Sequence, residues 1–320
     1  MMNPVAALVA VSALSLAAGC GGGTSTTGDA GAHDAAGHDA PAHDHAASDG
    51  PSRDGGGFIH ERILFLVDTS GAMVVLDASK ARVQAVDQVI QEHKGDSNVQ
   101  IAVIATNSST STFPAAGFTS AVDETAVDAL LSQAANLGDY EGGLDAVAKL
   151  VHQDAMATAA ATRAQTRYVV VYLGGSTPSP HCTAEATPCG STTCPAQTYC
   201  AAGSCNMQFL LCTTPRAQWS TTFNPPVNPS YYPDLVAGAD YNTSALIQQK
   251  VADIVALQSN DKIGSVEVNA VLVFDPSAAK NPLAAPFQLS RADSTQLLKQ
   301  MAKTGGGTYI DLSATPKLPF

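Results

Sequence analysis

A short apolar strand that ends in an acidic residue constrains this chain more than any other feature. Five consecutive apolar residues, from Ile63 to Val67, are followed directly by Asp68, Thr69 and Ser70. Such a run, bounded by polar turn residues, is typical of a strand buried on both faces of a parallel sheet. In open α/β sheets, ligands bind beyond the carboxyl ends of such strands. Because hard cations such as Mg²⁺ prefer oxygen ligands, the sequence predicts an oxygen-rich cation site at this strand tip.

Further apolar runs alternate with segments of helical spacing. The expected strands are Arg62–Asp68, Val99–Thr106, Tyr168–Leu173, Val266–Phe274 and Thr308–Leu312. The expected helices are Val75 to His93, a second that is capped by Ser120 or Asp123 and runs to about Ala135, Leu144 to Ala155, Leu246 to Leu257, and Asp293 to Ala302. This alternation predicts an α/β domain over residues 58–315, with a mostly parallel central sheet and helices on both faces. Residues 316–320 remain as a C-terminal tail.

The opening strand resembles that of the von Willebrand factor type A family. In that family an Asp-x-Ser-x-Ser motif joins a distant Thr and Asp to form a metal-ion-dependent adhesion site. Asp68 and Ser70 match the motif, whereas Ala72 stands where the family has its second Ser. The order of the elements, together with the closing helix and strand over residues 297–309, extends the resemblance from Ile63 to about Ser313. The resemblance implies a Rossmann-like three-layer fold.

The resemblance also shows how much of the metal site this chain retains. The family's Thr falls on Gly138 or its neighbour Asp139, and its later Asp falls on Gly175. The site is therefore degenerate, and Mg²⁺ or Ca²⁺ would need a replacement carboxylate from Asp139 or Glu141. The alternative is that the first Asp of the motif accepts hydrogen bonds from loop amides, while Ser70 caps the next helical turn.

The start of the chain predicts secretion and lipidation. Residues 5–18 form an apolar stretch that is too short to span a membrane and suits a signal-peptide core. It ends in Leu16-Ala17-Ala18-Gly19-Cys20, which resembles the lipobox of bacterial lipoproteins. That resemblance implies removal of residues 1–19, acylation of Cys20 and a membrane anchor in the bacterial cell envelope. In that family the residue after the Cys affects sorting, and Gly21 favours the outer membrane or cell surface. The alternative is an ordinary cleaved signal peptide.

Residues 20–57 contain a five-residue repeat with an Asp in each unit from position 29 to position 54. Apolar side chains larger than Ala are absent from residue 28 until Phe58, so we expect a disordered acidic spacer. The repeat also carries four histidines, which are His33, His38, His43 and His45. A weak metal-binding tract and a solvated spacer are the two interpretations of these histidines.

A cysteine-rich insertion is predicted at residues 176–240. Its six cysteines are Cys182, Cys189, Cys194, Cys200, Cys205 and Cys212. In a secreted protein such a set favours three disulfides of unknown pairing over a zinc site, whose usual C-x₂-C pairs are missing. Aromatic residues and prolines fill the rest of the insertion. Because it follows the strand that carries Gly175, we expect the insertion to cap or reshape the carboxyl-end face of the sheet.

These features favour a binding protein over an enzyme. The formal net charge is −12 and no basic cluster is present, which argues against nucleic-acid binding. Neither a G-x-S-x-G nor an H-E-x-x-H motif occurs. We therefore expect a non-enzymatic envelope lipoprotein whose domain mediates adhesion or binds a protein or another macromolecule. The alternatives are an envelope scaffold without a specific ligand site and a metal-handling lipoprotein that uses the histidine tract.

Overall fold

The computed structural model describes residues 57–183, 187–189, 192–194, 198–201, 204–207, 210–223, 226–275 and 291–320. The chain divides into residues 1–53 and 54–320, and all of the described residues belong to the second unit. The predicted signal segment, Cys20 and the histidine tract lie outside the described residues. Within the described part, no helix is both long and apolar enough to cross a membrane.

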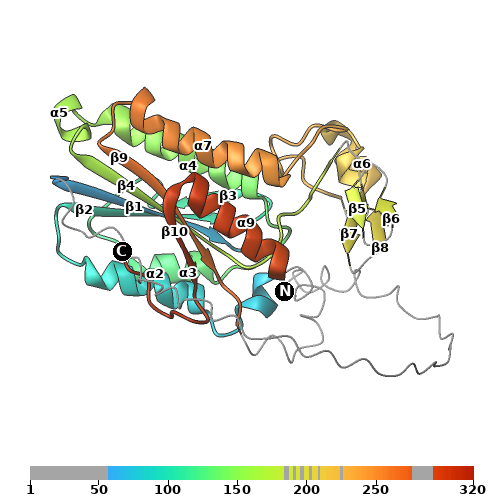
Figure 1. Ribbon diagram of the computed structural model, residues 1–320, viewed down its shortest axis with the longest axis horizontal. Helices are drawn as coiled ribbons and strands as arrows, with labels where there is room; N and C mark the ends of the chain where they lie inside the picture. Colours follow the sequence, from blue (N-terminus) through green and yellow to red (C-terminus); the bar gives the residue numbers. More distant parts are fainter. Residues whose placement is uncertain are drawn as a thin grey trace, which may run out of the picture. The chain divides into compact units, whose positions relative to one another are not determined.

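A six-stranded, mostly parallel sheet forms the centre of the domain (Figure 1). Its strand order is β10-β9-β4-β1-β2-β3, and only β3 runs antiparallel, paired with β2 at one edge. The strands are β1 (His60–Asp68), β2 (Val99–Thr106), β3 (Thr110–Phe113), β4 (Thr166–Gly174), β9 (Ser265–Leu272) and β10 (Gly306–Asp311). The five strands predicted from apolar runs are all confirmed. Strand β3 was not predicted, because it is short, rich in Thr and has no buried residue.

Helices cover both faces of this sheet. Figure 1 shows α2 and α3 on one side of the sheet and α4, α7 and α9 on the other. The helices are α1 (Met73–Leu76), α2 (Ala81–Glu92), α3 (Glu124–Leu131), α4 (Tyr140–Ala157), α5 (Ala160–Arg163), α6 (Trp219–Thr222), α7 (Ser244–Asn260) and α9 (Arg291–Thr304). Residues Ile63 to Val67 of the central strand have no exposed surface, as expected for a strand covered on both faces. The predicted α/β class with a mostly parallel sheet is confirmed.

The first predicted helix is wrong in one respect, because it is broken into α1 and α2. Lys80, between the two, has a left-handed backbone with φ 59°. The buried carboxylate of Asp77 accepts the N–H of Ala81 at 2.6 Å and pairs with Arg82 at 2.5 Å. The carboxylate thereby supplies an acceptor to the start of α2, where the chain has no helical partner of its own. The apolar spacing continues through this break, so periodicity alone could not detect it.

The second predicted helix is shorter than expected. Helix α3 ends at Leu131 instead of continuing to about Ala135. Its N-terminus is capped by Asp123, whose carboxylate accepts the N–H of Ala126 at 3.2 Å. Of the two proposed caps, Asp123 is therefore the one used.

Between β4 and α7 the chain builds a region with its own small core. Two antiparallel hairpins pair β5 (Thr187–Cys189) with β6 (Thr192–Cys194) and β7 (Thr198–Ala201) with β8 (Ser204–Met207). Short 3₁₀ turns follow at Leu210–Cys212 and Arg216–Gln218. A buried cluster separate from the main core contains Cys182, Leu211, Cys212, Trp219, Tyr232, Leu235 and Tyr241. The insertion therefore has apolar contacts of its own.

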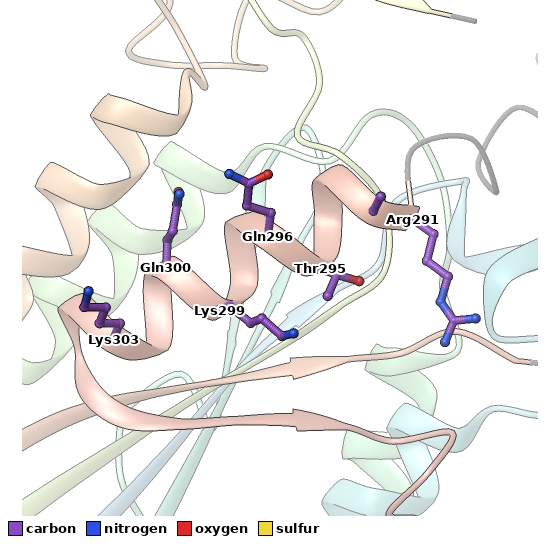
Figure 2. A pocket seen from close by; sticks show the side chains of 7 residues that line it. Arg291, Thr295, Gln296, Lys299, Gln300 and Lys303 are labelled. Carbon is purple, nitrogen blue, oxygen red and sulfur yellow. The ribbon is translucent and has the colours of Figure 1, made fainter. Parts of the chain in front are cut away.

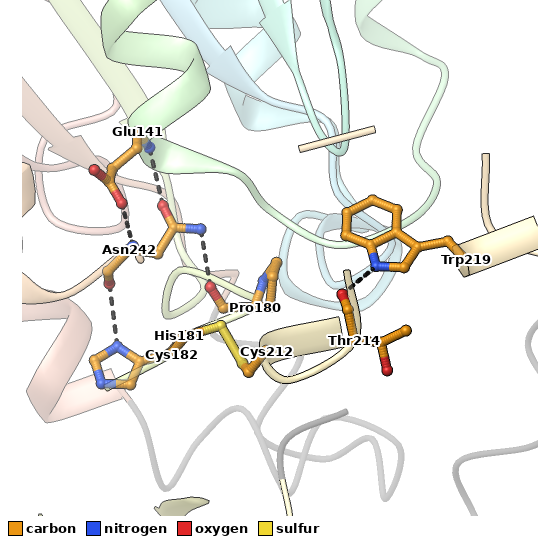
Figure 3. The surroundings of a disulfide bond; sticks show 8 residues. All are labelled: Glu141, Pro180, His181, Cys182, Cys212, Thr214, Trp219 and Asn242. Atoms are coloured by element: carbon orange, nitrogen blue, oxygen red, sulfur yellow. Dashed lines mark hydrogen bonds between the residues drawn. A yellow bond between two sulfur atoms is a disulfide. The ribbon is translucent and has the colours of Figure 1, made fainter. Parts of the chain in front are cut away.

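One disulfide lies in that cluster. It joins Cys182 to Cys212 with a Cα–Cα distance of 5.5 Å (Figure 3), and Trp219 belongs to the same buried cluster. The indole N–H of Trp219 donates to the carbonyl oxygen of Thr214 at 2.9 Å, so this buried side chain is satisfied. Cysteines 189, 194, 200 and 205 occupy the hairpins, and their pairing stays a prediction. In the β7–β8 register, Cys200 stands opposite Cys205.

Candidate functional site

The carboxyl end of β1 places Asp68 at the centre of a buried polar cluster. Asp68 has no exposed surface. One of its carboxylate oxygens accepts the backbone N–H of Ser70 at 2.8 Å, and the other accepts the hydroxyl of Ser176 at 3.0 Å. Burial raises the pKa of Asp68, and the Ser70 and Ser176 donors act in the opposite direction. Both carboxylate oxygens thus have donors from within the protein.

Two glycines at this tip differ in the space around them. A Cβ atom on Gly138 would lie 3.5 Å from the Oγ of Ser70 and 3.6 Å from a carboxylate oxygen of Asp68, which are ordinary contact distances. A Cβ atom on Gly175 would overlap the carbonyl oxygen of Val273. The end of β4 therefore packs so closely against the chain that leaves β9 that no side chain fits at position 175.

Two tyrosines cover the cluster on its inner side. The hydroxyl of Tyr140, the first residue of α4, donates to the carbonyl oxygen of Ser176 at 2.5 Å. The rings of Tyr140 and Tyr172 pack together with their centroids 4.9 Å apart. Both residues are fully buried, and burial raises the pKa of both phenols. The cluster is thus enclosed by aromatic rings as well as by backbone.

The acidic residues at the start of α4 face Tyr241 and Asn242, where the chain returns from the insertion; we call these two residues its return segment. Asp139 caps α4 by accepting the N–H of Gly142 at 3.1 Å, and its second oxygen accepts the hydroxyl of Tyr241 at 2.8 Å. A carboxylate oxygen of Glu141 accepts the backbone N–H of Asn242. Burial raises the pKa of Asp139 to about 6, although the Tyr241 hydroxyl lowers it. Burial also raises the pKa of Glu141.

Asn242 is the most connected of the residues at this site that the sequence did not predict, which also include Tyr140, Tyr172, Ser176 and Tyr241. It is fully buried and has a left-handed backbone with φ 53°, a conformation that Asn tolerates better than most residues. Its side-chain oxygen accepts the N–H group of Tyr140 at 3.1 Å. The same oxygen accepts the N–H group of Glu141 at 2.9 Å, and the side-chain amide donates to the carbonyl oxygen of Pro180 at 3.0 Å (Figure 3). No sequence signal reveals this role, because each partner is remote along the chain.

The described residues do not fit the metal site that the family resemblance implies. Asp68 and Ser70 lie together at the strand tip, as expected, and the Ser70 hydroxyl makes no hydrogen bond with the described residues. The positions of the missing ligands hold Ala72, Gly138 or its neighbour Asp139, and Gly175. Alanine and glycine offer no side-chain oxygen, and both carboxylate oxygens of Asp139 accept hydrogen bonds, from Gly142 and Tyr241. Among the described residues, no three His, Cys, Asp or Glu side chains are arranged to hold a metal ion. A hard cation usually needs more oxygen ligands than this tip supplies.

Two of the described histidines, His152 and His181, contact different partners. The ring of His152 lies 2.8 Å from a carboxylate oxygen of Asp261, and that of His181 lies 3.1 Å from the carbonyl oxygen of Asn242. Neither pair includes a serine or a free-thiol nucleophile, so these contacts supply no nucleophile–base pair of the kind used in covalent catalysis.

A shallow hollow on the outer face of α9 is the other surface feature of note (Figure 2). Its labelled side chains are Arg291, Thr295, Gln296, Lys299, Gln300 and Lys303. Arg291 pairs with Asp311 at 3.3 Å, and Lys299 lies over the ring of Tyr309. The described lining comes from one helix, whereas small-molecule sites usually have converging walls. We therefore place the candidate site at the carboxyl end of the sheet.

No protein-family profile and no curated protein matches this sequence. Among solved structures, the chain is similar to the pilus adhesin SpaC from Lactobacillus rhamnosus GG, with 13% identity, a TM-score of 0.45, and coverage of 80% of this chain and 28% of SpaC. It is also similar to the vWF domain of the type V pili tip protein Mfa5 from Porphyromonas gingivalis, with 12% identity, a TM-score of 0.40, and coverage of 81% and 93%. A third structure, von Willebrand factor type A from Catenulispora acidiphila, has 11% identity, a TM-score of 0.38, and coverage of 80% and 40%. Because these TM-scores are below 0.5, the fold assignment rests on the strands and helices of this chain.

Proposed function

We propose that this chain is a von Willebrand factor A-like protein of the bacterial envelope that binds another macromolecule through the carboxyl-end face of its sheet and the insertion there. The observation that carries the proposal is the attachment of the insertion. Its entry and return segments pair through Cys182 and Tyr241, each donating its N–H to the other's carbonyl at 2.9 Å. A disulfide and a separate apolar cluster hold it further. A region built this firmly where α/β folds bind ligands suits recognition.

The exposed apolar side chains support this location. Among the described residues, Val236 and Val74 are the two most exposed large apolar side chains, at 65% and 61%. Val236 belongs to the insertion and Val74 to α1, directly after the strand tip. Exposed apolar side chains are a usual component of the central part of a protein interface.

The rest of the proposal concerns attachment to the envelope. Removal of residues 1–19, acylation of Cys20 and an acidic spacer up to residue 57 would anchor the domain to a membrane surface. Several acyl chains together give stable anchoring, since each buried CH₂ contributes about 0.8 kcal/mol. The spacer would let the domain reach a macromolecule beyond the membrane.

Site-specific photo-crosslinking in the producing cell tests the proposal. A photoreactive amino acid replaces Val236 in the full chain, and in a matched control it replaces Met156, an exposed residue at the C-terminal end of α4. We expect a discrete crosslinked adduct from position 236 and none from position 156. Adducts of equal yield at both positions, or none at either, would contradict the proposal and favour the scaffold alternative.

A further inference from the structure

We propose that the acidic residues at the carboxyl end of the sheet form a metal-free clamp that fastens the insertion to the domain. We call Asp139, Glu141, Tyr241 and Asn242 the clamp, and Asp68 with Ser176 its inner anchor. On this view, a divalent cation neither fills the strand tip nor holds the insertion in place. The inference concerns how the insertion is held, and it stands whether or not the proposed partner exists.

The inner anchor uses the carboxylate that a cation would need first. Both oxygens of Asp68 already accept donors, the Ser70 amide at 2.8 Å and the Ser176 hydroxyl at 3.0 Å. Ser176 is the second residue after β4 and belongs to the start of the insertion. Its carbonyl oxygen in turn accepts the hydroxyl of Tyr140. The entry of the insertion is thus hydrogen-bonded to both β1 and α4 through Ser176. A cation bound to Asp68 would have to displace the Ser176 hydroxyl.

Close packing prevents a second carboxylate from approaching along β4. Gly175 lies where the family has its acidic ligand, and a side chain there would overlap the carbonyl oxygen of Val273. Val273 also donates its N–H to the carbonyl oxygen of Gly174 at 2.9 Å, which keeps the two chains together. The neutral hydroxyl of Ser70 is then the remaining oxygen of the matching motif, and one hydroxyl does not make a cation site.

Within the clamp, the two carboxylates at the start of α4 form hydrogen bonds with the return segment. Asp139 accepts from the hydroxyl of Tyr241, and Glu141 accepts from the backbone of Asn242. The Asn242 side chain bonds in the opposite direction to the first two amides of α4, and it also reaches Pro180 at the entry of the insertion. The entry segment, the return segment and the start of α4 are therefore joined by hydrogen bonds of one buried residue, Asn242. Because the first amides of α4 are already satisfied, the usual anion-binding capacity of a helix N-terminus is also used internally.

Asn242 allows a clean test because its backbone conformation is one that Gly adopts without strain. The variant Asn242→Gly removes the side-chain hydrogen bonds and keeps the left-handed backbone. The matched control is Asn136→Gly, since Asn136 has φ 62° and an exposed side chain. Hydrogen exchange of the full chain is followed by mass spectrometry with EDTA, with Mg²⁺ and with Ca²⁺.

We expect backbone amides in residues 179–182 and 239–243 to exchange at least about 10-fold faster in Asn242→Gly, with β1 and β4 unchanged. We expect no change in Asn136→Gly and no effect of either cation or of EDTA on the wild-type chain. Unchanged exchange in Asn242→Gly would overturn the inference. So would slower exchange in residues 135–143 or 176–182 on adding Mg²⁺ or Ca²⁺, if the variant Asp68→Ala abolishes that effect.

A second variant keeps the inference testable if Asn242→Gly does not fold. Tyr241→Phe removes only the hydroxyl that donates to Asp139 and leaves the ring in the apolar cluster. We expect faster exchange confined to the return segment. The same exchange rate as in the wild-type chain would contradict the clamp. Neither variant requires a partner, so the outcome is separate from that of the crosslinking experiment.

Discussion

The sheet and the insertion are stabilised in different ways. Residues Ile63 to Val67 of β1 are fully buried between two layers of helices, and their contacts are almost entirely apolar. The insertion has a much smaller apolar cluster, and it adds a disulfide and a set of buried hydrogen bonds at its base. A small apolar core usually needs such additions, because little surface is removed from water. The comparison teaches that the sheet depends on close packing and the insertion on specific crosslinks.

A substitution at Gly175 tests the close packing of the sheet and should have the largest effect on stability. We expect Gly175→Asp to destabilise the domain by more than about 4 kcal/mol, because the new Cβ atom overlaps the Val273 carbonyl oxygen and a carboxylate is buried. Gly138→Ala should cost less than about 1.5 kcal/mol, because its Cβ atom meets only ordinary contacts. Urea denaturation of both variants measures the two values. Equal losses of stability in the two variants would show that the close approach of Val273 to Gly175 does not exclude a side chain at position 175.

The next effect tests the crosslinks of the insertion. Replacing both Cys182 and Cys212 with Ser removes a disulfide whose cysteines are 30 positions apart in the sequence. We expect a loss of about 3 to 4 kcal/mol from the stability of the insertion, on the chain-entropy account of disulfides. Limited proteolysis should cleave the variant within residues 183–240 before it cleaves the sheet. Simultaneous cleavage of both regions would mean that the insertion and the sheet unfold as one unit.

The same contrast separates what the sequence could predict from what it could not. Apolar runs identified the inner strands β1, β2, β4 and β9, because burial on both faces leaves a local signal. The edge strand β10 was also predicted, although it is partly exposed. The break at Lys80 and the short edge strand β3 left no such signal. The roles of Gly175 and Asn242 depend on β9 and on α4, which are distant along the chain. Asp68 and Ser70 were correctly placed at a strand tip. One of the two donors to Asp68, the Ser70 amide, is local, but the other, the Ser176 hydroxyl, comes from a loop about a hundred residues away.

A smaller effect is expected at a single clamp hydrogen bond. Tyr241→Phe should destabilise the protein by about 1 to 2 kcal/mol, because the buried carboxyl of Asp139 loses a donor. As a control, Tyr231→Phe changes a partly exposed tyrosine of the same region and should cost less than about 0.5 kcal/mol. Chemical denaturation provides both numbers. If Tyr231→Phe lost as much stability as Tyr241→Phe, the hydrogen bond between Tyr241 and Asp139 would have no particular importance for stability.

The smallest effect concerns a carboxyl group outside the clamp. Asp87 of α2 lies beside Asp128 of α3, and burial and this like charge raise the pKa of Asp87 to about 6. A raised pKa means that the folded protein binds a proton more tightly than the unfolded chain, so stability falls as pH rises from about 4 to above 6. Asp87→Asn removes this loss, and we expect the variant to be more stable than the wild-type chain at pH 7.5 by up to about 1 kcal/mol. The gain should disappear near pH 4, where the wild-type group is protonated in the folded state. Urea denaturation at both pH values measures it, with Asp253→Asn as an exposed control. A gain of the same size at both pH values would mean that the substitution acts through packing or helix propensity, and not through the charge of Asp87.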